Sequence, residues 1–424
     1  MKYLIVIPDG AADEPRDDLD GRTPLEAAST PAIDGLAARG RSGLVSHVPE
    51  GFPPGSEVAC MSLLGYDPHA CFTGRAPLEA AASGITLGPH DWAVRCNLVT
   101  IRDDGPTPIM EDFTAGHVSS EEASELLAAA GEGLAREFPL VAEHWRFHPG
   151  VSYRNLLLFQ RETRGQLQGQ LQDTAAEPLA DDLRTVPPHD LTDKPVADAF
   201  PRGTGSRLLG EIMAASGRWF AGHPVNLRRV EAGHRPATHL WLWGAGRAPA
   251  MRPFSEIYGV SATMITAVDL LRGLAALAGW RRREVEGATG YLDTDYAAKG
   301  RAAAEELERA DLVCVHVEAP DEASHQGDTT EKITAIERID ELIVGPLVER
   351  LAGSEHRILV CPDHPTLLAT KTHSRGLVPY VIAGTGIEPD GGTSYGERTA
   401  AGGESVEPGW RLMGRFLGTT PGGS

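Results

Sequence analysis

The chain has 424 residues, of which 41% are hydrophobic and 23% are charged. This length and composition exclude wholesale disorder and leave room for roughly two to three domains. The formal net charge is −20, so the sequence lacks the basic balance of a general nucleic-acid-binding protein. No apolar run approaches about 18 residues, and we expect no membrane partner. The five cysteines form no CxxC pair, which favours a reducing, cytoplasmic location.

The N-terminal region predicts the start of an α/β domain. Residues 3–8 form an apolar run without alternation, which is typical of a strand buried on both faces. A helix follows over residues 30–40, where Thr30 precedes the first turn, Pro31 occupies its first position and Gly40 ends it. Residues 43–48 are the next predicted strand.

The middle of the chain has a different pattern. Strand-like runs at 93–101, 151–159 and 239–243 are interspersed with helices at 120–137 and 205–214. The polar, Gln- and Gly-rich segment 161–178 predicts a solvated hairpin or loop. We therefore expect an inserted α+β domain over residues 81–249, flanked by a core built from residues 1–80 and 250–424.

The C-terminal part returns to alternating helices and buried strands. We predict helices at 261–279, 301–309 and 333–351, and strands at 312–317, 357–361 and 378–383. The alternation favours a parallel sheet covered by helices on both faces. The tail from about residue 408 is expected to be frayed.

Three of the predicted strands run directly into a Pro-Asp step. They end in LIVIPDG with Asp9, VHVEAPDEASH with Asp321 and ILVCPDH with Asp363. Ligands of open parallel sheets collect outside the carboxyl ends of the strands, so these three carboxylates are expected to converge. For each aspartate alone, a turn or helix cap is the commoner role.

Histidines accompany these aspartates. His325 follows Asp321 by four residues, which places both on one face of a helical turn, His364 follows Asp363, and His373 lies nine residues further on. Aspartate and histidine together suit borderline divalent cations such as Mn²⁺ or Zn²⁺, and six ligands suit two adjacent ions. The sequence cannot distinguish Mn²⁺ from Zn²⁺, Co²⁺ or Mg²⁺.

Ser56, in PPGSEVA, is the candidate nucleophile. Gly55 is expected to give backbone freedom before it, and a helix is predicted to start after it, with backbone N–H groups available to an anion. A hydroxyl beside a metal ion loses its proton more readily and can attack phosphorus. The alternative is that Ser56 only caps the helix.

At these residues the sequence resembles a known family, the archaeal-type 2,3-bisphosphoglycerate-independent phosphoglycerate mutases of the alkaline phosphatase superfamily. The resemblance spans about residues 1–400, and several of the motifs are long. The motifs are IPDGAAD, TPLEAASTPAIDGLAARG, PPGSEVACMSLLGYDP, TGRAPLEAA, RCNLVT, TAGHVSSEEA, PGVSYRN, WLWGAGR, VEGATGYLDTDY, PDEASHQGD and PDHPT.

The resemblance implies an alkaline-phosphatase-like α/β core with an inserted substrate-binding lid. It also implies two metal ions, one held by Asp321, His325 and His373, and the other by Asp9, Asp363, His364 and Ser56. Ser56 would take the phosphate of 3-phosphoglycerate, and the retained glycerate would receive it back on its other hydroxyl, a step of glycolysis. The implied partner is a small phosphorylated anion.

Four further residues are candidates for binding the substrate. His117, Arg154 and Arg247 lie in the predicted insert, where they would hold the glycerate carboxylate and exclude water. Lys299 would neutralise the transferring phosphate. Each has a plainer alternative as a helix-start, ion-paired or solvated residue.

Two segments depart from the archaeal pattern. The chain has PDHPT where archaeal members typically have GDHST, and EAPDEASHQGD at the other metal segment; both look like a bacterial branch proposed to include homoserine kinases. A homoserine kinase is therefore the first alternative, although the sequence has no Walker or kinase glycine-rich motif. A phosphatase or phosphodiesterase, and a non-catalytic metal-binding or scaffold protein, are the others. The oligomeric state stays open.

Overall fold

The computed structural model describes residues 1–102, 105, 107–161 and 179–419. The chain divides into two compact units, the first made of Met1–Phe72 and Ala250–Ser424 and the second of Thr73–Pro249. The second unit thus begins at Thr73, whereas the sequence predicts that it begins at residue 81. It starts earlier because helix α5 (Arg75–Ala82) packs its small residues on this unit's own sheet.

An eight-stranded sheet forms the core of the first unit, with the strand order β15-β2-β14-β11-β1-β10-β8-β9. Strand β1 (Lys2–Pro8) lies parallel to both of its neighbours, β10 (Leu312–Val317) and β11 (His356–Val360). Only β14 (Val378–Gly384) runs antiparallel to its neighbours within this described sheet. The predicted α/β class with a mainly parallel sheet is confirmed.

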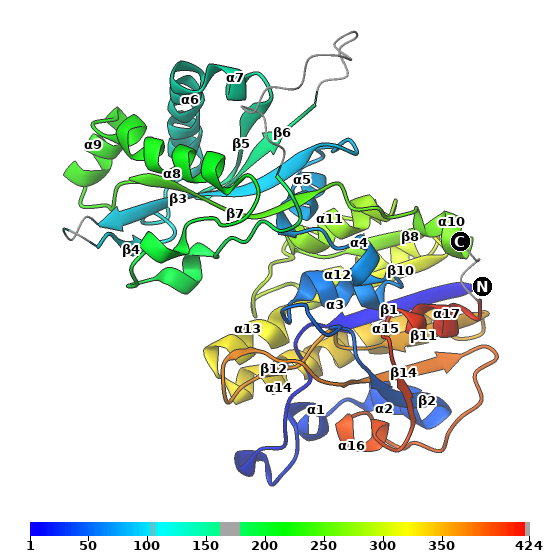
Figure 1. Ribbon diagram of the computed structural model, residues 1–424. Coiled ribbons are helices and arrows are strands. Elements are labelled where there is room, and N and C mark those ends of the chain that lie inside the picture. Colours follow the sequence, from blue (N-terminus) through cyan, green and yellow to red (C-terminus); the bar gives the residue numbers. More distant parts are fainter. Residues whose placement is uncertain (103–104, 106, 162–178, 420–424) are drawn as a thin grey trace. The chain divides into compact units, whose positions relative to one another are not determined.

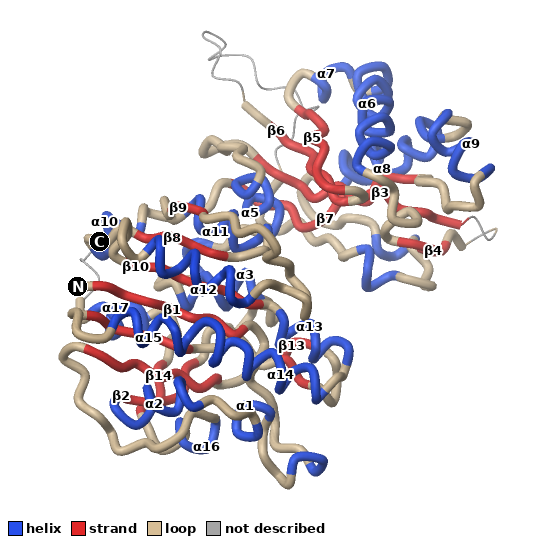
Figure 2. The backbone as a smooth tube through the Cα atoms, turned by 180° about the vertical axis from the view of Figure 1, so that it is seen from behind, coloured by secondary structure: helices blue, strands red, loops and turns tan. Residues whose placement is uncertain are grey.

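Helices cover both faces of this sheet (Figures 1 and 2). Phe416 of α17 (Arg411–Leu417) stacks edge-on against Tyr3 of β1, with ring centroids 5.6 Å apart. On the opposite face, Glu306 of α12 (Tyr296–Glu306) accepts a hydrogen bond from the Thr263 hydroxyl. Burial on both faces explains why these strands are apolar runs without alternation.

Two predictions for the C-terminal part are wrong. Residues 261–279 are not one helix, because the buried strand β8 (Ala262–Ile265) pairs with β10 before helix α11 (Asp269–Leu277) begins. A continuous apolar run does not distinguish a buried strand from a buried helix. The tail is not frayed from residue 408, because α17 buries Leu412, Met413 and Phe416; residues 420–424 lie outside the described part.

The remaining elements of the first unit connect these strands. They are α1 (Pro24–Ala27), α2 (Pro31–Arg39), β2 (Gly40–Val45), α3 (Ser56–Leu63), α4 (Pro68–Cys71), α10 (Phe254–Tyr258), β9 (Arg281–Arg282), α13 (Ala319–Gln326), α14 (Thr329–Ile339), α15 (Gly345–Leu351), β12 (Thr366–Leu367), β13 (Thr372–His373), α16 (Glu397–Ala400) and β15 (Glu404–Val406).

The second unit is built on an antiparallel sheet around the long strand β3 (Trp92–Arg102). Its partners are β4 (Ile109–Asp112), β6 (Arg154–Phe159) and β7 (His239–Arg247), and β5 (Trp145–Val151) pairs with β6. Helices α6 (Ser120–Glu137) and α8 (Ser206–Phe220) enclose the larger apolar core; α7 (Pro139–Ala142) and α9 (Pro224–Glu231) complete the unit.

The sequence-based expectations for the second unit hold in part. The predicted strand 151–159 is divided by a turn at Ser152 and Tyr153, which separates β5 from β6. The predicted hairpin or loop at 161–178 lies, apart from its first residue, outside the described residues. Among the described helices, none is both long and apolar enough to span a lipid bilayer.

Candidate active site

Three neighbouring parallel strands bring the three Pro-Asp aspartates to one edge of the sheet. Asp9 follows β1 at the centre of the sheet, Asp321 lies in the first turn of α13 after β10, and Asp363 follows β11. All three carboxylates are buried. This convergence places strong negative charge in a low-dielectric site, an arrangement that requires cations or protons for balance.

The first candidate metal group consists of Asp321, His325 and His373. The Nε2 atoms of the two histidines are 3.0 Å apart, and they lie 3.2 and 3.4 Å from the two carboxylate oxygens of Asp321. Nδ1 of His325 donates to the carbonyl oxygen of Lys371, which directs Nε2 towards the group. Hydrogen bonding to Asp321 raises the pKa of His325 to about 9 in the absence of a metal ion.

The second group surrounds Ser56. Nε2 of His364 lies 3.1 Å from the Ser56 Oγ, 3.4 Å from the Asp363 Oδ2 and 3.6 Å from the Asp9 Oδ1. The Ser56 hydroxyl also donates to the Asp9 Oδ2 over 3.4 Å. Potential ligand atoms of Asp9, Asp321 and His364 lie within 4.8 Å of one another, so the Asp321 carboxylate is shared by both groups.

Ser56 is the first residue of α3, and Gly55 is its N-cap. Ser56 is therefore not the N-cap residue, and its side chain points to Asp9 and His364, so the capping alternative is wrong. The expected reason for Gly55 is also wrong, because its φ of −179° is accessible to any residue. A Cβ there would instead lie 2.9 Å from the carboxylate of Glu57.

The donor set fits divalent cations. Oδ1 of Asp9 is buried and has no hydrogen-bond partner among the described residues, so this oxygen is available to coordinate a cation. Burial, together with the charges of Asp363 and Asp321, raises the pKa of Asp9 well above its ordinary value. Gly10 has φ +61°, and a Cβ there would lie 2.5 Å from an Asp321 oxygen, so glycine preserves the space beside these carboxylates.

Thr366 contacts the side chains of both Asp321 and His364, and the sequence reasoning missed it. Its hydroxyl donates to the Asp321 Oδ1 over 2.5 Å, because a carboxylate can only accept. Its oxygen is then free to accept from Nδ1 of His364, which is 3.2 Å away. In the neutral ring this arrangement leaves the lone pair of the His364 Nε2 facing Ser56 and Asp9.

His316 was also missed. It is a fully buried histidine in the otherwise apolar strand β10, and this isolated polar residue is the signal that could have identified it. Its Nε2 lies 2.9 Å from the Asp9 Oδ2. Burial lowers the pKa of His316 to about 3, so the ring is neutral and orients Asp9 as a hydrogen-bond donor.

Lys299 lies behind His316. Its side chain extends from α12 and is almost completely buried, and its Nζ donates to the His316 carbonyl oxygen over 3.2 Å. Burial lowers the pKa of Lys299 to about 8, opposed by the charge of Glu318. Burial and the Asp321 charge raise the pKa of Glu318 to about 8. A pKa of about 8 is compatible with a positive charge on the predicted lysine at neutral pH.

The structure separates Arg154 from Arg247 in the second unit. Arg154 lies opposite Asn97, whereas Arg247 lies opposite Trp92, five positions away on β3. Because alternate residues of a strand point to opposite faces, the two arginines project from opposite faces of the sheet. Arg247 forms an exposed ion pair with Asp181, in which its Nη2 donates to the two carboxylate oxygens over 2.7 and 2.6 Å, and it lies over the Trp92 ring.

A row of aromatic rings connects His117 with Trp243 in the same unit. The ring centroids are 6.3 Å apart for His117 and Tyr153, 5.9 Å for Tyr153 and Phe113, 6.1 Å for Phe113 and His189, and 5.5 Å for His189 and Trp243. Burial lowers the pKa of His189, so its ring is a neutral hydrogen-bonding group at neutral pH.

Arginines that the sequence reasoning missed gather around Trp243. The Arg95 guanidinium lies 4.0 Å from the Trp243 ring centroid, and that of Arg75 lies 6.0 Å away. Burial lowers the pKa of Arg95 to about 10; Glu79, its ion-pair partner, opposes this shift, while Arg75 and Arg154 add to it. Arg75, Arg95 and Arg154 thus concentrate positive charge around Trp243, which suits an anion.

Comparisons with known proteins point to one family. A profile described as 2,3-bisphosphoglycerate-independent phosphoglycerate mutase matches residues 37–226, and one described as type I phosphodiesterase / nucleotide pyrophosphatase matches residues 194–366. The chain is 46% identical over 403 residues to the 2,3-bisphosphoglycerate-independent phosphoglycerate mutase of Methanothrix thermoacetophila, covering 95% of each chain. It is 44% identical over 423 residues to the probable enzyme of that name from Geobacter sulfurreducens, covering 98% of this chain and 100% of the relative.

Solved structures show the same relationship. A protein from Pyrococcus horikoshii is 27% identical, with a TM-score of 0.78, and covers 100% of this chain and 99% of its own. The cofactor-independent phosphoglycerate mutase of Thermoplasma acidophilum is 26% identical, with a TM-score of 0.66, and covers 99% of both chains. The similarity therefore extends over both compact units and is not limited to the sheet with the candidate site.

Proposed function

The chain belongs to the 2,3-bisphosphoglycerate-independent phosphoglycerate mutase family, and we propose that it interconverts 3-phosphoglycerate and 2-phosphoglycerate through a phosphoserine at Ser56. The observation that carries the proposal is the position of the Ser56 hydroxyl, at the start of α3 and 3.1 Å from His364. The same hydroxyl faces the buried carboxylate of Asp9. A serine in this position can accept a phosphoryl group and pass it on.

The proposed mechanism includes two bound divalent cations. One group of ligands is Asp321, His325 and His373, and the other is Asp9, Asp363, His364 and Ser56. The orphaned Asp9 oxygen and the shared Asp321 carboxylate support this assignment. When bound, the cations supply charge that stabilises the phosphoryl group and acidifies the serine hydroxyl. Mn²⁺ is our first choice, and Zn²⁺, Co²⁺ and Mg²⁺ are the alternatives, because mixed carboxylate and imidazole ligands do not select among them.

Phosphoryl transfer then takes place in two matched steps. The Ser56 Oγ attacks the phosphorus of 3-phosphoglycerate, the bond from phosphorus to the C3 oxygen breaks, and the serine proton ends on that oxygen. Glycerate is retained and reoriented, and its C2 hydroxyl attacks the phosphoserine. The bond to Ser56 breaks, the proton returns to Oγ, and 2-phosphoglycerate leaves. No external phosphate donor is needed, because each phosphate removed is returned.

The substrate's carboxylate and phosphate need further cations. We assign phosphate neutralisation to Lys299, which is supported by its burial and by its bond to the residue that orients Asp9. We assign carboxylate binding to Arg154 and His117 and add Arg75 and Arg95, because these arginines form a local concentration of positive charge. The second unit is then the substrate-binding lid. Arg247 is the weakest candidate, because its guanidinium group already forms an ion pair with Asp181.

The activity is tested by phosphorus NMR of the protein with Mn²⁺ and 3-phosphoglycerate, without 2,3-bisphosphoglycerate. A 2-phosphoglycerate signal should grow and should be abolished by a chelator. Ser56→Ala should lose the activity, whereas Ser394→Ala, which removes an exposed hydroxyl from the same unit, should retain it. Full activity of Ser56→Ala would refute the mechanism.

The same phosphorus NMR assay, repeated with ATP and homoserine as a second mixture, separates the alternatives. Phosphohomoserine formed from ATP and homoserine at a higher kcat/KM than the mutase reaction would identify a kinase. Glycerate and free phosphate as the main products would identify a phosphatase. A cytoplasmic location is part of the proposal and is supported by the five cysteines, each of which is free and buried.

A further inference from the structure

A pocket lies in the first unit, at the far end of the helix that begins with Ser56. Its volume is about 800 Å³, within the range of small-molecule sites. Gly65, Tyr66 and Asp67, which follow the last turn of α3, form part of its lining. The eight residues of α3 span about 12 Å, and none of the candidate metal ligands lines this pocket. It is therefore a site distinct from the one described above.

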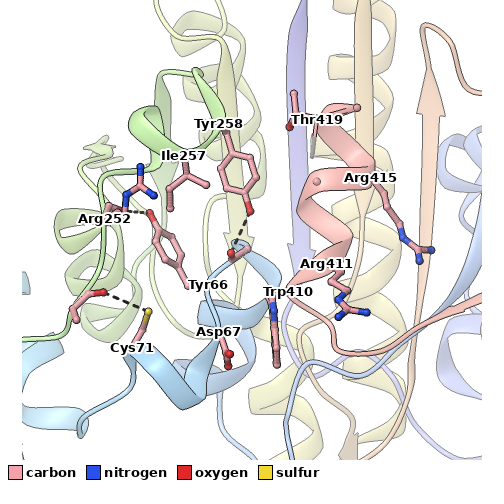
Figure 3. A pocket seen from close by; sticks show the side chains of 14 residues that line it. Tyr66, Asp67, Cys71, Arg252, Ile257, Tyr258, Trp410, Arg411, Arg415 and Thr419 are labelled. Atoms are coloured by element: carbon pink, nitrogen blue, oxygen red, sulfur yellow. Dashed lines mark hydrogen bonds between the residues drawn. The ribbon is translucent and has the colours of Figure 1, made fainter. Parts of the chain in front are cut away.

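Aromatic side chains form the walls of this pocket (Figure 3). Tyr258 and Ile257 come from α10, Tyr66 from the turn after α3, and Trp410 from the residue before α17. The Tyr66 hydroxyl donates to the Arg252 carbonyl oxygen over 2.9 Å, and that of Tyr258 donates to the Gly65 carbonyl oxygen over 3.2 Å. These bonds fix the two tyrosine rings, which are 3% and 6% exposed, so the pocket keeps its shape when a ligand binds.

Three arginines line the same pocket, namely Arg252, Arg411 and Arg415, against the single carboxylate of Asp67. The Arg415 guanidinium is paired with Glu404 at 2.6 Å. Those of Arg252 and Arg411 are exposed and form no ion pair or hydrogen bond with any residue that the structure describes. On a chain of net charge −20, this is a local excess of unneutralised positive charge. Figure 3 shows Arg411 beside Trp410 and Arg252 on the opposite wall.

We propose that this pocket binds a nucleoside phosphate, with the base packed against the partly exposed ring of Trp410 and the phosphate held by Arg252 and Arg411. A partly exposed indole ring suits a flat heterocycle, and guanidinium groups bind phosphate oxygens in a bidentate manner. The volume accommodates a ligand of this size. This inference is independent of the proposed function, because it concerns binding at a different site.

The test is isothermal titration calorimetry of the metal-loaded protein with AMP, in the presence of saturating 3-phosphoglycerate so that the candidate active site is occupied. AMP should bind with a stoichiometry of one, and adenosine, which lacks the phosphate, should bind about tenfold more weakly or worse. Arg252→Gln and Arg411→Gln should each weaken AMP binding by about tenfold. Arg207→Gln, an exposed arginine on α8, is the matched control and should bind AMP as the wild type does.

Several results would overturn the proposal. They are the absence of AMP binding, equal affinity for AMP and adenosine, and unchanged AMP affinity in both the Arg252→Gln and the Arg411→Gln variants. Circular dichroism and mutase activity report whether each variant is folded, since neither arginine belongs to the proposed catalytic machinery. Loss of AMP binding only when 3-phosphoglycerate is added would place the nucleotide in the candidate active site and would also overturn it.

Discussion

Replacing Lys332 with methionine should destabilise the first unit. Lys332 is fully buried, and its Nζ donates to the Asp13 Oδ2 at 2.9 Å, the Thr366 carbonyl oxygen at 2.8 Å and the Ala12 carbonyl oxygen at 3.5 Å. It thereby ties the loop after β1 to the loop that carries His364. Methionine keeps the packing but leaves the carboxylate of Asp13, whose side chain is 2% exposed, without its cation.

The expected loss follows from that uncompensated carboxylate. Removing one partner of a buried ion pair costs about 3–5 kcal/mol, and backbone donors that remain on Asp13 favour the lower end. The assay is urea unfolding of metal-free protein, followed by tryptophan fluorescence and circular dichroism. Lys371→Met is the control, because that lysine is exposed and donates to a single carbonyl oxygen, so it should lose less than about 1 kcal/mol.

A double-mutant cycle refines the test. Adding Asp13→Asn to Lys332→Met removes the buried charge, so the double variant should be destabilised by less than the sum of the single variants, by about 1–3 kcal/mol. If Lys332→Met unfolds within about 1 kcal/mol of the wild type, or the two changes are additive, the ion pair does not hold these loops and the reasoning fails.

Three further predictions concern the site and its surroundings. Thr366→Val should lower metal affinity by about 10–100-fold, measured by competition with a chelator, because Asp321 loses its donor; unchanged affinity would exclude the positioning role. Lys299→Met should lower kcat by about 10²-fold without changing metal content, and a purely structural lysine would leave kcat intact. Burial raises the pKa of Glu397 to about 7 from 4.5, so its stabilising contribution is full below about pH 4.5 and is lost as the pH rises through about 7. Between about pH 5 and 8, the free energy of unfolding of Glu397→Gln, measured in urea, should therefore rise relative to that of the wild type. A difference that does not change with pH would contradict this.

The sequence predicted the parallel core because its strands are unbroken apolar runs that end in Pro-Asp. Their position in the sheet follows from the pairing of β1 with both β10 and β11, which no local pattern reveals. The same lack of local information explains the error over residues 261–279, where an apolar strand and an apolar helix follow each other. The hydrophobic periodicity does not show where the strand ends and the helix begins. That boundary follows from the pairing of β8 with β10.

The candidate site shows a similar limit. The Asp and His residues were visible as motifs, whereas Thr366 and His316 become relevant only through contacts between segments far apart in the chain. Arg154 and Arg247 looked equivalent in sequence, and only the register against β3 separates them. Residues that act by orienting a neighbour carry little local signal of their own, because their role depends on tertiary geometry.

In the proposed mechanism, Ser56 carries the phosphate between the two substrate positions. The most direct measurement is to mix the metal-loaded protein with 3-phosphoglycerate, stop the reaction with acid during turnover and locate the phosphate by peptide mass spectrometry. Phosphoserine should be found at position 56 in the wild type, and Ser56→Ala should give no phosphorylated peptide. Mutase turnover without phosphate at Ser56, or with the phosphate on another residue, would contradict this mechanism.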